Sequence, residues 1–293
     1  MKKFKGTGVA IVTPFKSDAS IDFTAMGRVV NHVINGGVNY IVALGTTGES
    51  VTLTHDEKNA VISYVAEIID GRLPLVVGFG GNNTQEVINS IRQADLEKVD
   101  GILSVAPYYN KPSQKGLVMH FKAVATCSPV PVIVYNVPSR TSCNMTADTS
   151  LELAHECDNI VAIKESSGDI SQIMKIIKGK PDNFSVISGD DMMTLPVIAA
   201  GGAGVISVLA NAFPAVCSEI VNHALKHNFK SARELQFKFM EAIELLFLEG
   251  SPAGVKAFMS MLGLCNNALR LPLVSVSRQT YSRIQKVLEE VTV

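Results

Sequence analysis

Eight short apolar runs, each bounded by turn-forming residues, constrain the fold of this chain more than any other feature. They are rich in valine and isoleucine and carry few polar residues, which is typical of strands buried on both faces of a parallel sheet. Their starts recur at intervals of roughly 20 to 35 residues, the length of one strand–helix unit. The runs are Gly8–Thr13, Tyr40–Leu44, Leu75–Phe79, Gly101–Ala106, Pro131–Tyr135, Ile160–Lys164, Phe184–Ser188 and Ala203–Leu209.

The segments between these runs have helical patterns, such as the capping box Thr54-His55-Asp56-Glu57 ahead of an apolar face. Eight alternating units predict a (β/α)8 TIM barrel. A doubly wound open sheet is the alternative, but it normally has fewer units or a nucleotide-binding glycine fingerprint. We expect residues 1–211 to form the barrel core. Residues 212–293 are predicted to add the final barrel helix and a C-terminal helical appendage, with helices over Ala232–Glu249 and Ser277–Glu290.

The charge balance narrows the class of partner. With 26 basic and 27 acidic residues, the net charge of −1 argues against nucleic acid or an anionic membrane as the partner. The uncharged stretch Met192–Ser218 is broken by glycine and proline, so we expect no membrane span there. The five cysteines are widely spaced and form no CxxC pair. Reduced thiols in the cytoplasm are therefore predicted.

In a barrel of this kind the chemistry lies at the carboxyl ends of the strands. Lys164 ends the sixth run, and alternation puts Ile160, Ala162 and Lys164 on one face of that strand. If this face points to the barrel axis, burial favours the neutral amine, which can attack a carbonyl and form a Schiff base. The alternative is a solvated lysine, or one paired with Glu165.

Three other strand ends carry candidate groups, each with an ordinary structural alternative. Tyr135 could shuttle protons, or it could be an amphipathic tyrosine at the core boundary. The loop Gly45-Thr46-Thr47-Gly48 could hold a carboxylate or phosphate, or its glycines could serve only the turn. Arg140 could clamp a carboxylate, or it could be a surface arginine.

We expect no metal. His223 and His227 have helical spacing, but the glutamate of an HExxH motif is missing. Asp190-Asp191 is better interpreted as the cap of the helix that follows.

Four motifs at successive strand ends carry a resemblance to a known family. They are Gly45-Thr46-Thr47-Gly48-Glu49, Pro107-Tyr108-Tyr109-Asn110-Lys111-Pro112, Tyr135-Asn136-Val137-Pro138-Ser139-Arg140-Thr141 and Ile163-Lys164-Glu165. In this order the chain resembles the dihydrodipicolinate synthase family of pyruvate-dependent class I aldolases, which includes N-acetylneuraminate lyase. The similarity runs from about Gly6 to the C-terminal helices.

The resemblance implies a role for each matching residue. Lys164 matches the lysine that forms an imine with pyruvate, and Tyr135 matches the proton-shuttling tyrosine. Thr46 and Tyr109 match its relay partners, of which the family supplies the tyrosine from a neighbouring subunit. Substrate contacts are implied for Thr47 (the pyruvate carboxylate), Arg140 (the semialdehyde carboxylate), Gly189 and Ile206 (around the imine).

The implied reaction condenses pyruvate with L-aspartate 4-semialdehyde to 4-hydroxy-tetrahydrodipicolinate, in the diaminopimelate route to lysine. The implied assembly is a homotetramer, a dimer of dimers, and the covalent imine needs no cofactor. A related aldolase that releases pyruvate from a sugar-derived 2-keto acid is the alternative. A barrel that only binds a ligand is a further one, although it has no need of an inward-facing lysine.

Two departures from the family pattern matter. Many relatives read Asn-Pro-Ile-Pro-Val-Lys where this chain reads Ser251-Pro252-Ala253-Gly254-Val255-Lys256. Because this segment is remote from the four motifs, we expect it to affect tail packing more than chemistry. Lys58 stands in the allosteric lysine pocket that the resemblance implies, where regulated relatives often carry His or Glu, and its cation opposes a cationic ligand. We therefore predict weak or absent inhibition by lysine. The other residues that align with this pocket are Ser50, Val51, His55, Asn82, Glu86 and Tyr108.

Overall fold

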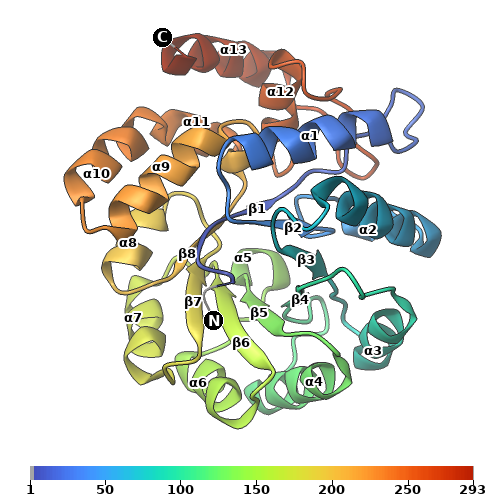
Figure 1. Ribbon diagram of the computed structural model, residues 1–293, viewed down its shortest axis with the longest axis vertical. Coiled ribbons are helices and arrows are strands. Elements are labelled where there is room, and N and C mark those ends of the chain that lie inside the picture. Colours follow the sequence, from blue (N-terminus) through green and yellow to red (C-terminus); the bar gives the residue numbers. More distant parts are fainter. Residues whose placement is uncertain (1–2, 293) are drawn as a thin grey trace.

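The computed structural model describes residues 3–292, and its centre is a closed barrel of eight parallel strands in sequence order (Figure 1). Strand β1 pairs with β8, with Gly8 opposite Ile206, and this pairing closes the ring. Each predicted run overlaps one strand, so the predicted (β/α)8 barrel is confirmed. The strands are β1 (Gly6–Ala10), β2 (Tyr40–Ala43), β3 (Leu75–Gly78), β4 (Gly101–Val105), β5 (Val132–Asn136), β6 (Ile160–Glu165), β7 (Ser185–Ser188) and β8 (Gly204–Ser207).

Helices surround the barrel, and the last four form the predicted C-terminal appendage (Figure 1). The first part of the chain has α1 (Phe23–Asn35), η1 (Ser50–Thr52), α2 (His55–Ile69), α3 (Thr84–Gln93), α4 (Gln114–Cys127), α5 (Pro138–Thr141), α6 (Ala147–Glu156) and α7 (Ile170–Gly179). It continues with α8 (Thr194–Ala199), η2 (Leu209–Asn211), α9 (Pro214–Leu225), α10 (Phe229–Lys238), α11 (Met240–Leu245), α12 (Ala253–Met261) and α13 (Arg278–Thr292). Within residues 3–292, no helix is long and apolar enough to cross a membrane.

The barrel separates two apolar cores. Side chains from all eight strands fill the interior, and Phe4 packs edge-on against Tyr40 with ring centroids 5.8 Å apart. A larger core lies between the strands and the surrounding helices. Because alternate residues of each strand face these two cores, both faces exclude water, as expected for a parallel sheet with helices outside.

The alternation predicted for β6 is wrong at its first residue. Val132 pairs with Ile160, but the next residue, Ile133, pairs with Ala162, so Val161 is the extra residue of a β-bulge. Ile160 therefore packs in the outer core, and Val161 packs against the interior. Beyond the bulge the alternation is regular.

The helix predicted over Ala232–Glu249 is two helices in the structure. Helix α10 ends at Lys238 and α11 begins at Met240, with Phe239 between them in a non-helical conformation. This break lets the buried Phe239 ring pack edge-on against Phe213, with centroids 5.1 Å apart. Packing of one aromatic ring therefore outweighs the helical pattern of the sequence.

Candidate active site

Lys164 lies near the carboxyl end of β6, and its side chain is shielded from solvent. Only 5% of its surface is exposed. Its neighbour Ala162 lies in the interior core, so the lysine side chain shares the interior face of the strand. The predicted inward orientation is therefore confirmed, despite the bulge at Val161.

Tyr135 is paired directly with Lys164 across β5 and β6. The Lys164 Nζ lies 4.3 Å from the centroid of the Tyr135 ring, and 6% of the tyrosine is exposed. This arrangement brings an amine and a phenol side by side at the end of the barrel. A nucleophile and a proton-transfer group at this separation can act on the same bound molecule.

A cavity of about 520 Å³ opens above these two residues, and we call it the catalytic cavity. The predicted residues Thr46, Thr47, Arg140 and Gly189 line it together with Tyr135 and Lys164. Ile206 is fully buried in the interior core and does not line this cavity. The remaining wall comes mainly from other strand-end loops and from the segment after α11: Val137, Ser139, Ser166, Asp190, Met192, Val208, Ile243, Glu244, Phe247, Gly250 and Ser251.

Gly189 lies against the side chain of Lys164, where a larger residue would not fit. A methyl carbon at this position would lie 2.7 Å from Lys164 Cε and 2.9 Å from its Cγ, closer than side chains tolerate. Ser166 Oγ would be nearer still, at 2.0 Å, so the glycine after β7 leaves room for both Lys164 and Ser166. This steric relation is a physical reason for Gly189 at the site, independent of any contact with a substrate.

A buried polar network surrounds Glu165, the residue after Lys164, and its hydrogen bonds were not predicted from the sequence. Glu165 faces away from Lys164 and accepts hydrogen bonds from the Ser167 N–H at 2.7 Å, Gln172 Nε2 at 3.1 Å and Asn136 Nδ2 at 3.2 Å. Burial raises the pKa of Glu165, and these donors oppose the shift. The alternative pairing of Glu165 with Lys164 is thus wrong. Asn136 and Glu165 directly follow Tyr135 and Lys164, and that adjacency was the available signal.

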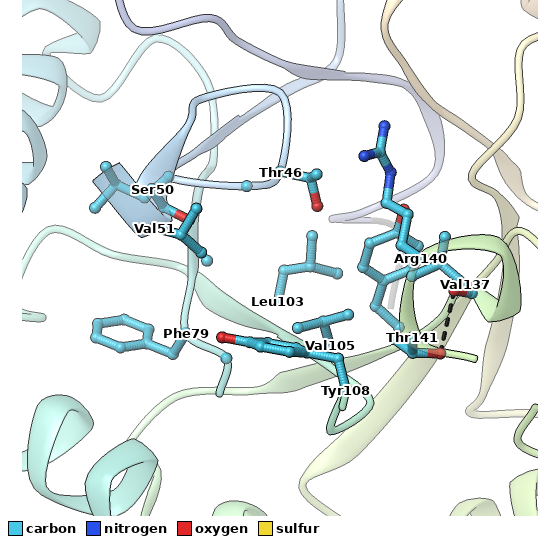
Figure 2. A pocket seen from close by; sticks show the side chains of 15 residues that line it. Thr46, Ser50, Val51, Phe79, Leu103, Val105, Tyr108, Val137, Arg140 and Thr141 are labelled. Carbon is cyan, nitrogen blue, oxygen red and sulfur yellow. Dashed lines mark hydrogen bonds between the residues drawn. The ribbon is translucent and has the colours of Figure 1, made fainter. Parts of the chain in front are cut away.

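A second cavity, of about 220 Å³, adjoins the first one, and we call it the mouth cavity (Figure 2). Figure 2 shows Arg140 and Thr46 on one side of it, with Ser50, Val51 and Phe79 on the other. Thr46, Tyr135, Val137 and Arg140 line both cavities, so the two are neighbours.

Tyr109 lies away from the other candidate residues of its own chain. Its surface is 88% exposed, and it lines neither cavity. Its backbone is left-handed, with φ 74°, which is uncommon for a residue that has a side chain. Thr46 is exposed as well.

The residues that align with the family's lysine pocket gather in a third cavity, of about 450 Å³, which we call the side cavity. Its wall includes Ser50, Val51, His55, Lys58, Asn82 and Glu86, whereas Tyr108 lines the adjoining mouth cavity. Lys58 is half-buried there, and burial lowers its pKa. Lys58 therefore lines the space that the resemblance implies as a lysine pocket, and the predicted weak or absent inhibition by lysine stays a prediction.

The expectation that Ser251–Lys256 is remote from the motifs is wrong. Ser251 lines the catalytic cavity, and Lys256 Nζ lies 2.5 Å from Glu49 Oε1 in the first motif. The interpretation of Asp190-Asp191 as the cap of the next helix is also wrong, because the N-cap of α8 is Met193 and no side chain caps it. The Asp191 carboxylate instead accepts the N–H groups of Val208 and Leu209, at 2.9 and 3.2 Å, at the start of η2.

A lysine and a tyrosine meet at the carboxyl end of a (β/α)8 barrel, under a cavity with an arginine at its rim. This combination defines a barrel of the class I aldolase type, in which a lysine amine attacks a carbonyl.

Comparison with known proteins identifies the family. The model of the dihydrodipicolinate synthetase family matches residues 3–291. The 4-hydroxy-tetrahydrodipicolinate synthase of Flavobacterium psychrophilum is 52% identical over 284 residues, which are 97% of each chain. That of Parabacteroides distasonis is 48% identical over 99% of this chain and 97% of its own. The crystal structure of dihydrodipicolinate synthase from Aquifex aeolicus matches with a TM-score of 0.95 at 41% identity, over 99% of this chain and 98% of that one. The chain belongs to the dihydrodipicolinate synthetase family.

Proposed function

We propose that Lys164 forms an imine with pyruvate, as the first step of a condensation with L-aspartate 4-semialdehyde. The chain is a class I aldolase-type lyase that makes 4-hydroxy-tetrahydrodipicolinate in the diaminopimelate route to lysine. The observation that carries the role of Lys164 is its burial beside Tyr135 at the cavity floor. An amine shielded from water is the group that such a reaction requires.

The chemistry proceeds without a cofactor. The amine of Lys164 attacks the pyruvate ketone, and the carbonyl oxygen leaves as water to give the imine. Loss of a proton from the pyruvate methyl group turns the imine into an enamine, whose carbon attacks the aldehyde. The product then cyclises through its own amine, which displaces Lys164. Tyr135, whose ring lies 4.3 Å from the amine, is the group that moves protons in these steps.

Two loops supply the proposed contacts to the substrate carboxylates. Thr47, which is buried, holds the pyruvate carboxylate from the loop after β2. Arg140, which is exposed at the rim, binds the carboxylate of the semialdehyde with its planar guanidinium. Gly189 and Ile206 surround the imine from β7 and β8.

A second copy of the chain completes the proton relay in this proposal. Tyr109 is too exposed to act within its own chain, and Thr46 and Tyr135 line the mouth cavity, which has room for an aromatic ring. We infer that a neighbouring subunit inserts its tyrosine there, within a homotetramer built as a dimer of dimers. Replacement of Tyr109 by Phe is then expected to lower kcat while imine formation survives, because only proton transfer is lost.

The cytoplasm is the proposed compartment of this enzyme. All five cysteines are free, and three of them are buried. Unpaired thiols persist where glutathione and thioredoxin keep them reduced.

A steady-state assay with alternative substrates tests the proposed function. Pyruvate with L-aspartate 4-semialdehyde should give rapid turnover, and a sugar-derived 2-keto acid should release no pyruvate. The reverse pattern would favour the related aldolase. Replacement of Arg140 by Ala should raise the KM for the semialdehyde and leave imine formation with pyruvate unchanged.

A further inference from the structure

A fully buried ion pair joins the first motif to the C-terminal helices. Lys256, in α12, donates a hydrogen bond to Glu49 Oε1 at 2.5 Å, and both side chains are completely shielded from solvent. The two residues are 207 positions apart in the sequence. A buried charge is tolerated only where its partners are fixed, so this pair demands a defined arrangement of both segments.

Every charged group of the pair has further fixed partners. Lys256 also donates to the carbonyl of Ala268 at 2.8 Å, and its Nζ lies 4.3 Å from the centroid of the Phe15 ring. The second carboxylate oxygen of Glu49 accepts the backbone N–H of Arg270 at 3.1 Å. The carboxylate is therefore held from two sides by one C-terminal segment.

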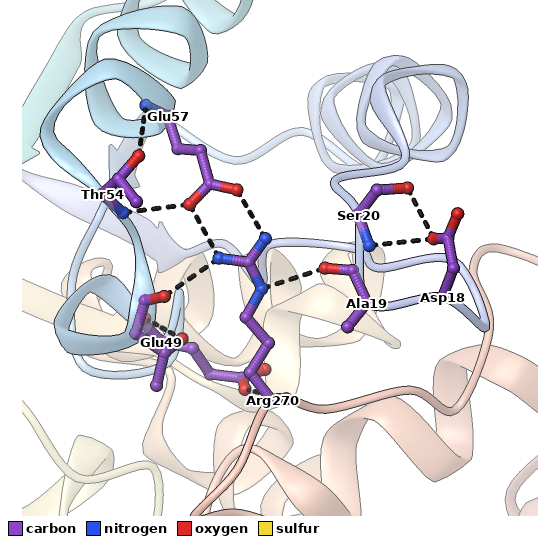
Figure 3. A network of polar contacts seen from close by, with 8 residues as sticks. Asp18, Ala19, Ser20, Glu49, Thr54, Glu57 and Arg270 are labelled. Atoms are coloured by element: carbon purple, nitrogen blue, oxygen red, sulfur yellow. Dashed lines mark hydrogen bonds and ion pairs between the residues drawn. The ribbon is translucent and has the colours of Figure 1, made fainter.

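Arg270 adds a second clamp next to this pair (Figure 3). Its guanidinium binds the Glu57 carboxylate through two nitrogens, at 2.7 and 2.5 Å, and donates to the carbonyl of Thr52 at 2.9 Å. Figure 3 shows the Glu57 carboxylate facing the guanidinium of Arg270. Arg270 therefore binds the turn after the first motif and the start of α2 as well as Glu49.

The loop that carries Thr46 and Thr47 ends at Glu49. The backbone of Glu49 is left-handed, with φ 51°, and its N–H donates to the carbonyl of Thr46 at 3.1 Å. Because a left-handed conformation is disfavoured for a residue with a side chain, contacts of that side chain must hold it. The ion pair with Lys256 and the backbone N–H of Arg270 supply these contacts.

We propose that Glu49 and Lys256 are positioning residues, which set the loop so that Thr47 can receive the pyruvate carboxylate. The C-terminal helices then belong to the catalytic scaffold, although they contribute no reacting group. This inference rests on the proposed role of Thr47 in the condensation.

Substrate-specific kinetics test the proposal in Glu49→Gln, in Lys256→Met and in the variant with both changes. Each should raise the KM for pyruvate about tenfold, as expected when one charge-assisted contact is lost. The KM for the semialdehyde should stay within about twofold, because Arg140 lies on another loop. The double variant has no unpaired buried charge, so it should regain thermal stability over the single variants and keep the raised pyruvate KM.

Two further variants make the result decisive. Glu241→Gln breaks the exposed Arg283–Glu241 pair between the C-terminal helices α11 and α13, and it should leave both KM values unchanged. Arg270→Gln removes the neighbouring clamp and leaves Glu49 and Lys256 paired, so it should raise the pyruvate KM by about threefold. If the double change prevents folding, Glu49→Gln, which keeps the shape of the side chain and removes its charge, is the deciding variant.

The contrary outcomes are distinct. A folded double variant with a wild-type pyruvate KM would overturn the proposal, as would a parallel rise of both KM values. If the double variant does not fold, an unchanged pyruvate KM in a folded Glu49→Gln variant overturns it. The wild-type chain is tested alongside by borohydride trapping with pyruvate. Failure of the wild type to form an adduct at Lys164 rejects the proposed function itself, whereas an adduct with unaffected variants rejects only the positioning role.

Discussion

Replacement of Gly189 by Ala should disable Lys164 without touching the lysine itself. The new methyl carbon would lie 2.0 Å from Ser166 Oγ, 2.7 Å from Lys164 Cε and 2.9 Å from its Cγ, whereas ordinary contacts begin at 3.4 Å, so both side chains must move. The lysine must therefore move by roughly 0.7 Å, and a displacement near 1 Å costs about 10²-fold in rate. Overpacking of this kind also lowers the free energy of unfolding by about 1–3 kcal/mol, which a barrel of this size tolerates.

The assay for this variant is the rate at which pyruvate and borohydride together modify the protein, followed by intact mass. We expect a rate about 10²-fold below that of the wild type, with a matching loss of kcat/KM. Gly116→Ala, in α4 and remote from the cavities, is the matched control, because its nearest neighbour would be 3.3 Å away. A wild-type rate of modification in Gly189→Ala would refute the steric argument.

Three other predictions concern charges that the structure fixes. Arg270 holds the pKa of Glu57 at about 2, below its ordinary 4.5, so this contact stabilises the fold above pH 4.5 and is lost as the pH falls toward 2. Urea unfolding over that range should therefore show a weaker pH dependence in Arg270→Gln, and equal slopes would contradict the assignment. Lysine should inhibit the enzyme weakly or not at all because of Lys58, and a sharp fall in initial rate at submillimolar lysine would count against this. In Glu165→Gln an NH2 group replaces one of the carboxylate oxygens that accept hydrogen bonds, so a buried donor loses its acceptor. The free energy of unfolding of this variant, measured with urea, should fall by about 1–3 kcal/mol. An unchanged value would contradict this prediction.

The barrel was predictable from the sequence because the strands are short segments rich in valine and isoleucine that recur at the length of one strand–helix unit. Local pattern could not reveal the bulge at Val161, which depends on how β6 pairs with β5. It could not reveal the break at Phe239 either, because the cause is packing against Phe213, more than twenty residues earlier in the chain. The errors thus occur where a tertiary contact outweighs a local preference.

The site was predictable to the extent that strand ends converge. Lys164, Tyr135, Thr46, Thr47 and Arg140 come from the ends of three strands and the segments that follow them, and the geometry of the barrel brings them to one cavity. The support for that cavity was not predictable in the same way. The contact between Glu49 and Lys256 depends on how the C-terminal helices pack, and no periodicity in the sequence encodes it.

Borohydride trapping with pyruvate, followed by peptide mapping, tests the central claim most directly. The claim predicts one reduced adduct, on Lys164, and none in a folded Lys164→Ala variant. An adduct on another lysine would contradict the assignment of the nucleophile. No adduct at all from folded wild-type protein would contradict Schiff-base chemistry in this barrel.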